Sequence, residues 1–149
     1  MGTSMAMLMA AMMAATAVPF FVAFGRDTKR PAAIATVVVI YAAVWGLIGV
    51  AAAALMDRVM MPGGPVVIGA ALAFAVVYAV MPWSRWARGR CSEMCRRVAR
   101  GPALREGTTY AACCVVCTAG VMGALIVLGM SNLPLMAGAT AVMLVYKLI

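Results

Sequence analysis

The metal-binding side chains that are abundant in this sequence are those that contain sulfur. The chain has 5 Cys and 15 Met but no His. Cys91 and Cys95 are four residues apart, and Cys113, Cys114 and Cys117 form a second group. Residues three or four apart share one face of a helix, so each group can present several sulfurs together. Thiolates favour Cu(I), Zn²⁺ and iron–sulfur clusters, and zinc usually requires four ligands. The cysteines are therefore candidate ligands for a soft metal, and Cu(I) is favoured because it accepts fewer ligands.

The methionines near the N-terminus form a second candidate site. The spacing of Met5, Met9, Met12 and Met13 places them on one face of a helix. Thioethers bind Cu(I) without losing a proton. The alternative for both groups is packing, because Met fills irregular gaps between helices and buried Cys behaves as a small apolar side chain. The residues alone leave both interpretations open.

The sequence offers little for acid–base or nucleophilic catalysis. Without His there is no imidazole base, and the 4 Asp and Glu residues fall outside the long apolar stretches. A proton relay or a hard-cation site within those stretches would need such carboxylates, and a serine-centred triad would need a His. We therefore expect no enzymatic activity, and Cu(I) is the only cofactor that the residues suggest.

The elements that must position the sulfur residues are long apolar helices. Hydrophobic residues make up 66% of the chain and charged residues 11%, and the mean hydropathy is +1.05. Soluble domains are nearer half apolar and a quarter charged. The predicted fold class is all-α, a polytopic membrane helix bundle forming one integral membrane domain over residues 1–149. Apolar runs predict about five transmembrane helices, at about 4–24, 32–56, 66–81, 109–129 and 135–149.

A basic segment separates the third and fourth predicted spans. It covers residues 83–108, and we expect an amphipathic helix there on the cytoplasmic face. Its aromatic and basic residues Trp83, Arg85, Trp86 and Arg88 are typical of an interfacial belt that contacts anionic lipid headgroups. Nucleic-acid binding is the disfavoured alternative, because retention of positive loops in the cytoplasm already explains the net charge of +8.

The same positive loops predict an orientation. Arg26, Lys29 and Arg30 follow the first span, seven Arg lie in the basic segment and Lys147 is near the C-terminus. Five spans would put all of these on one side, which predicts an external N-terminus and a cytoplasmic C-terminus in an inner (plasma) membrane.

Four motifs carry a resemblance to a known family. They are Ala11-Met12-Met13 with Pro19-Phe20, Tyr41 with Trp45-Gly46, Cys91 with Cys95-Arg96, and Cys114 with Cys117 ahead of Gly129-Met130-Ser131-Asn132-Leu133. In order and spacing the chain resembles a bacterial family of predicted metal-binding integral membrane proteins, over about residues 5–147. The resemblance implies a metal site. Met94 stands where that family has a His, and Thr118 where it has a second adjacent Cys, so sulfur is what remains of the implied ligand set.

Two classes of function follow. The first is a membrane protein that binds or handles a soft metal, with Cys91, Cys95, Cys114 and Cys117 as inner ligands and the N-terminal methionines as an outer site. Cys113 and Met94 would lie nearby. The second is a non-catalytic accessory subunit of a larger membrane complex, for example of a copper-dependent enzyme, because the many small residues favour close helix packing with other subunits. Transport is a weaker third class, since no charged residue in the apolar stretches marks a translocation path. The sequence does not determine whether the two sulfur regions meet.

Overall fold

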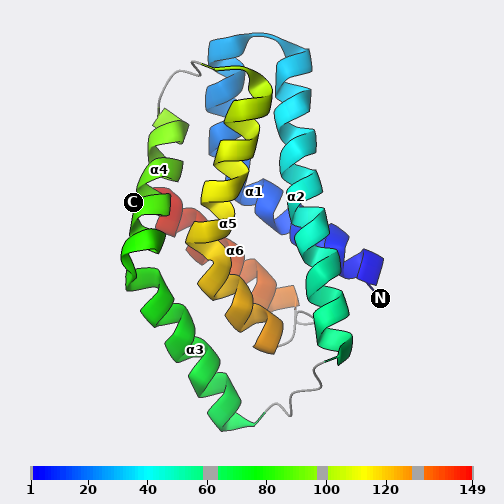
Figure 1. Ribbon diagram of the computed structural model, residues 1–149, viewed down its shortest axis with the longest axis vertical. Helices are drawn as coiled ribbons and strands as arrows, with labels where there is room; N and C mark the ends of the chain where they lie inside the picture. Colours follow the sequence, from blue (N-terminus) through cyan, green and yellow to red (C-terminus); the bar gives the residue numbers. More distant parts are fainter. Residues whose placement is uncertain (1, 59–63, 97–100, 129–132, 149) are drawn as a thin grey trace.

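The computed structural model describes residues 2–58, 64–96, 101–128 and 133–148, and within these ranges it is a bundle of six helices without strands. The helices are α1 (Gly2–Thr28), α2 (Pro31–Arg58), α3 (Pro65–Val80), α4 (Pro82–Arg96), α5 (Ala103–Leu128) and α6 (Leu133–Leu148). The prediction of an all-α bundle is confirmed. Figure 1 shows α5 in the middle, with α2 on one side and the α3–α4 pair on the other.

The first two helices form a hairpin with a very short turn. Helix α1 continues to Thr28, through charged residues that the apolar pattern placed outside the span. It ends where Lys29 adopts a left-handed conformation with φ of 50°, and the Lys29 amide donates to the Gly25 carbonyl at 3.1 Å. A left-handed residue commonly closes a helix in this way. Pro31 then begins α2, where its missing amide hydrogen costs nothing.

Helices α3 and α4 form a pair bent by 64°. Met81 breaks the helix with an extended conformation, as expected for a residue before Pro82. Helix α4 is amphipathic, as predicted for the basic segment, and it buries Ser84, Ala87 and Cys91. Helix α4 lies along α5 (Figure 1).

The predicted basic segment, 83–108, includes parts of two helices. Helix α4 ends at Arg96 and α5 already begins at Ala103. The apolar pattern starts only at residue 109 because hydropathy registers Arg105 and Glu106 as breaks. Both residues are compatible with a first helical turn, and an acidic residue is favourable at that end of a helix.

Three helical segments are long and apolar enough to cross a membrane, namely Ala6–Thr28, Pro31–Met56 and Ala103–Leu128. The bent α3–α4 pair makes a fourth if it counts as one span. The apolar part of α6, Met136–Tyr146, is shorter. The described residues therefore support three or four spans by length, where the apolar pattern predicted about five.

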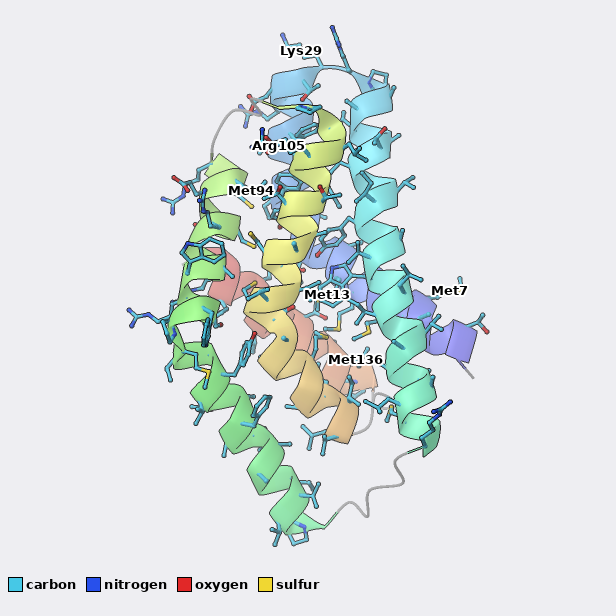
Figure 2. The ribbon with its side chains drawn as sticks, viewed as in Figure 1. Met7, Met13, Lys29, Met94, Arg105 and Met136 are labelled. Carbon is cyan, nitrogen blue, oxygen red and sulfur yellow. The ribbon has the colours of Figure 1, made fainter. Side chains whose placement is uncertain are left out.

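Positive charge gathers at one end of the bundle. Lys29, in the α1–α2 turn, and Arg105, at the start of α5, lie at the same end (Figure 2). Helix α2 runs from that end to the opposite one, where it finishes at Arg58. The orientation of the chain in a membrane stays a prediction.

Close helix approach fixes α3 against α5. A Cβ atom on Gly120 would lie 2.7 Å from both Cβ and Cδ1 of Tyr78, and the Tyr78 hydroxyl donates to the Val116 carbonyl at 2.7 Å. Only a glycine permits this contact without a shift of the tyrosine ring. Because α5 carries three of the five cysteines, this contact helps to set the register of the sulfur residues.

We expect Gly120→Ala to destabilise the protein by about 1–3 kcal/mol, the usual range for overpacking a close contact. Gly46→Ala is the matched control, because nothing lies within 4 Å of its added Cβ and alanine is the better helix former by about 1 kcal/mol. Thermal unfolding in detergent, followed by circular dichroism, compares the two. Equal melting temperatures would show that α3 does not hold α5 at Gly120.

Candidate metal centre

Three cysteines from two helices converge in the core. Cys91 of α4 meets Cys114 and Cys117 of α5, and the three Sγ atoms lie within 4.8 Å of one another. All three side chains are buried. Cys114 and Cys117 are three residues apart, so α5 presents them on one face, and α4 adds Cys91 from its buried side. We call these three residues the thiol trio.

The spacing of the trio fits one soft metal ion. A metal about 2.3 Å from each of three sulfurs in a trigonal plane requires the sulfurs to be about 4 Å apart. The trio meets this requirement with little movement. Structural zinc would need a fourth ligand, and among the described Cys, Asp and Glu side chains no fourth joins the group. The donor set therefore suits a three-coordinate thiophilic ion such as Cu(I).

Hydrogen bonds on α5 hold the trio in position. Thr118 Oγ1 donates to the Cys114 carbonyl at 2.7 Å, and Cys117 Sγ donates to the same oxygen at 3.3 Å. Both bonds turn side chains back along the helix, where hydroxyls and thiols in apolar surroundings find their nearest acceptor. Thr118 is thus a supporting residue of the site, in the place of the cysteine that the resemblance implied.

Tyr41 connects the trio to the methionine region. Its hydroxyl donates to the Met13 carbonyl at 3.1 Å and lies 3.2 Å from Cys114 Sγ. A hydroxyl has one proton, so while it donates to Met13 the Cys114 thiol must donate to it. A Cys114 thiolate would instead need a donor, and the Tyr41 hydroxyl can turn its proton toward the sulfur. The arrangement can serve both protonation states of Cys114.

Aromatic rings enclose this side of the trio. Tyr110 stacks on Phe20 with ring centroids 3.8 Å apart and planes 8° from parallel. The centroid of the Tyr41 ring lies 5.8 Å from that of Tyr110 and 6.3 Å from that of Trp45. All four rings are buried, so water is kept from one side of the sulfurs.

The surroundings of Cys91 favour its protonated form when no metal is bound. Cys91 is buried close to the Cys114 and Cys117 thiols, and burial disfavours the charged thiolate. Three neighbouring thiolates would repel one another in the absence of a cation, so metal binding must displace protons from the trio.

The other two cysteines lie outside the trio. Cys113 is buried beside it on α5 but does not belong to the group of converging sulfurs. Cys95 is half-buried one turn beyond Cys91, and its thiol lies 4.0 Å from the Tyr110 hydroxyl. Met94 is half-buried and packs against the core. The sequence grouped all five cysteines as ligands, whereas the structure brings three together.

The methionine face of α1 points into the bundle. Met9, Met12 and Met13 are buried in the same core cluster as the trio, whereas the side chain of Met5 lies outside the described residues. Met122, Met136 and Met143 join them from α5 and α6. Figure 2 shows Met13 and Met136 inside the bundle and Met7 directed outward. The two sulfur regions therefore meet, through Tyr41 and the core.

The aromatic and basic residues of α4 lie on its outer side. Trp83 and Trp86 are 67% and 61% exposed, and Arg85 is also exposed. Arg88 is half-buried and lies over the Tyr146 ring at 4.3 Å. This contact joins α4 to the end of α6, so Arg88 has a structural partner as well as the predicted lipid contact.

Sequence reasoning gave no role to Tyr41, Tyr110 and Thr118, although Tyr41 belongs to one of the quoted motifs. The available signal was their chemistry. A tyrosine or threonine in the middle of an apolar helix must find a hydrogen-bond partner, and the partners here are a thiol and helix carbonyls.

The fold is an apolar helix bundle whose buried cluster of three thiols could hold a soft metal ion. In a comparison with protein families, the chain matches the PpoB2 family, described as copper chaperones, over residues 3–149. The chain belongs to this family. No curated protein and no solved structure matches it.

Proposed function

We propose that this protein is a membrane-embedded Cu(I) chaperone in which Cys91, Cys114 and Cys117 hold the ion. The observation that carries the proposal is the convergence of three buried thiols within 4.8 Å on two helices. Copper is the cargo. Family membership over residues 3–149 supports the same metal, and the three-sulfur donor set explains how Cu(I) would be held in preference to zinc.

The proposal places the bundle in the bacterial inner membrane. The three long apolar segments and the gathering of Lys29 and Arg105 at one end support this location, with the basic end in the cytoplasm. The exposed Trp83, Arg85 and Trp86 would then lie near lipid headgroups. The trio lies about midway along α5, beneath α4, and a reducing compartment at the basic end would keep thiols that are reached from that side available.

Metal analysis combined with X-ray absorption tests the proposal. We expect the protein, purified anaerobically in detergent and loaded with Cu(I), to retain one tightly held copper with a first shell of sulfur only. Zinc offered at the same concentration should be displaced by Cu(I). Copper that binds to oxygen or nitrogen, or a variant lacking all three trio thiols that still retains copper, would contradict the assignment.

A chaperone must pass its metal to another protein. A role as the accessory subunit of a copper-dependent enzyme is therefore compatible with the proposal. The exposed apolar side chains of α3, including Val66, Leu72 and Phe74, can face lipid or a partner helix. The distinguishing experiment is gentle purification from native membranes with identification of co-purifying chains. If a copper enzyme co-purifies in constant proportion, the protein is a stable accessory subunit. If the protein purifies alone, it is a transient copper donor.

We expect Tyr41→Phe to weaken Cu(I) binding by about 10–100-fold, the usual cost of losing a group that hydrogen-bonds a metal ligand. The variant keeps the ring and removes only the hydroxyl that lies 3.2 Å from Cys114 Sγ. Competition with a chromophoric Cu(I) chelator measures the change. Tyr146→Phe is the control, because its hydroxyl bonds the Ala79 carbonyl of α3 and neither of the helices that carry the trio; equal losses in both variants would show that Tyr41 acts on the fold alone.

A further inference from the structure

A pocket of about 240 Å³ leads to the thiol trio from the side of α4. Cys91 and Cys95 both line it, one helical turn apart, together with Ser92, Arg96 and Tyr110. Arg96 is exposed and Cys95 is half-buried, whereas Cys91 is buried. Burial therefore increases along the pocket, from the charged Arg96 at the rim through the Cys95 thiol to Cys91 of the trio.

The rim carries a fixed positive charge. Arg96 Nη2 donates to Ser92 Oγ at 2.8 Å, and both side chains line the pocket. This bond ties the guanidinium to the wall of the pocket. A positive group at the mouth of a small cleft raises the local concentration of anions and repels cations.

Cys95 lies between this rim and the trio. It shares the face of α4 that carries Cys91, and residues four apart on a helix are neighbours. Its thiol contacts the Tyr110 hydroxyl at 4.0 Å, but it is not one of the three converging sulfurs. Cys95 is thus close enough to pass a metal to Cys91 without being a ligand of the final site.

We propose that the pocket is the loading port for Cu(I) delivered as an anionic low-molecular-weight thiolate complex, with Cys95 as the capture ligand and Arg96 as the anion-attracting group. The inference rests on the proposed function and adds the donor class and the route. A volume of about 240 Å³ is smaller than the sites that take drug-sized ligands, which begin at about 300 Å³. It admits the metal-bearing end of a small thiolate, and a folded donor domain could not enter.

The capture step is a ligand exchange without redox change. The Cys95 sulfur forms a bond to Cu(I) as one bond from Cu(I) to the carrier sulfur breaks, and the Cys95 thiol proton passes to the departing carrier thiolate. Cys91 then replaces Cys95 in the same manner, and its proton returns to Cys95. Cys114 displaces the last carrier sulfur by the same exchange, and Cys117 binds with loss of its proton to water. Copper stays Cu(I) throughout, and both carrier molecules leave as free thiols.

Stopped-flow loading of the full-length protein in detergent tests this route, with Cu(I)–glutathione as the anionic donor and Cu(I)–acetonitrile as the cationic donor. Ultraviolet absorption of the copper–thiolate bonds reports filling of the trio. We expect Cys95→Ser to slow loading from Cu(I)–glutathione by on the order of tenfold, because a local first ligand acts through its effective concentration. The final amount of bound copper is set by the trio and should be reached in time.

Arg96→Gln gives an independent measurement at an exposed position. We expect it to slow loading from Cu(I)–glutathione by about tenfold at low salt and to abolish the salt dependence of that rate, since steering of charged ligands is screened by salt. Loading from Cu(I)–acetonitrile should be unchanged or faster. Arg105→Gln is the matched control, because Arg105 is exposed at the same end of the bundle and does not line the pocket.

The outcomes separate the two proposals. If the unmodified protein fills with copper and Cys95→Ser loads from Cu(I)–glutathione at the unmodified rate, the loading port is wrong and the chaperone proposal stands. Equal slowing of both donors by Arg96→Gln also overturns the port. If the unmodified protein takes up no copper from either donor, the proposed function fails, and the port fails with it.

Discussion

Replacing Cys114 with serine is expected to abolish tight Cu(I) binding, whereas the same replacement at Cys113 leaves it in place. The two residues are neighbours on α5 and both are buried, yet only Cys114 belongs to the trio. We expect the affinity of Cys114→Ser to fall by more than about 100-fold, since loss of a group that merely hydrogen-bonds a ligand already costs about 10–100-fold. Competition with a chromophoric Cu(I) chelator measures both variants.

The pair is well matched because serine preserves most of the local structure. It is close in size to cysteine, and its hydroxyl can keep the hydrogen bond to Tyr41 that Cys114 makes at 3.2 Å. Thr118 and Cys117 bond the backbone carbonyl of residue 114, which the replacement does not touch. A comparable loss in Cys113→Ser would mean that copper binds elsewhere on α5 and that the trio is a packing cluster.

The fold could be predicted largely because the apolar pattern is long and uninterrupted. Runs of small and aliphatic residues predicted helices, and the predicted breaks at the first basic loop and at 57–65 fall close to the ends of α1, α2 and α3. Hydropathy did not locate the helix ends where charged residues are part of a helix. Arg105 and Glu106 begin α5, although they look like part of a loop, and α4 packs along α5 despite its many arginines.

The candidate site was only partly predictable, for a geometric reason. Spacing along one helix shows that Cys114 and Cys117 share a face, but it says nothing of which other helix this face meets. The choice of Cys91 over Cys95 depends on the 64° bend between α3 and α4 and on the way α4 settles against α5. Likewise, no periodicity links Met13 to Cys114, whose carbonyl and thiol respectively meet the Tyr41 hydroxyl of α2.

Cu(I) affinity is expected to rise steeply with pH, and this dependence distinguishes the trio from the methionine face. The three thiols are buried and close together, which disfavours three neighbouring thiolates without a cation, so protons occupy the apo site at neutral pH and must leave as the metal binds. Protons compete with copper, so affinity falls as pH is lowered. With three thiols deprotonated on binding, the apparent association constant should change by about 1,000-fold per pH unit below about pH 8.

Chelator competition between pH 6 and pH 8, roughly the range over which ordinary thiols stay protonated, measures the slope, after correction for the chelator's own protonation. A slope near three protons per copper is the signature of the trio. Thioethers carry no proton to lose, so a site made of Met9, Met12 and Met13 would give a slope near zero. That result would mean that copper binds to the buried methionines of α1, which lie in the same core. The cysteines of the trio would then serve only to pack the helices.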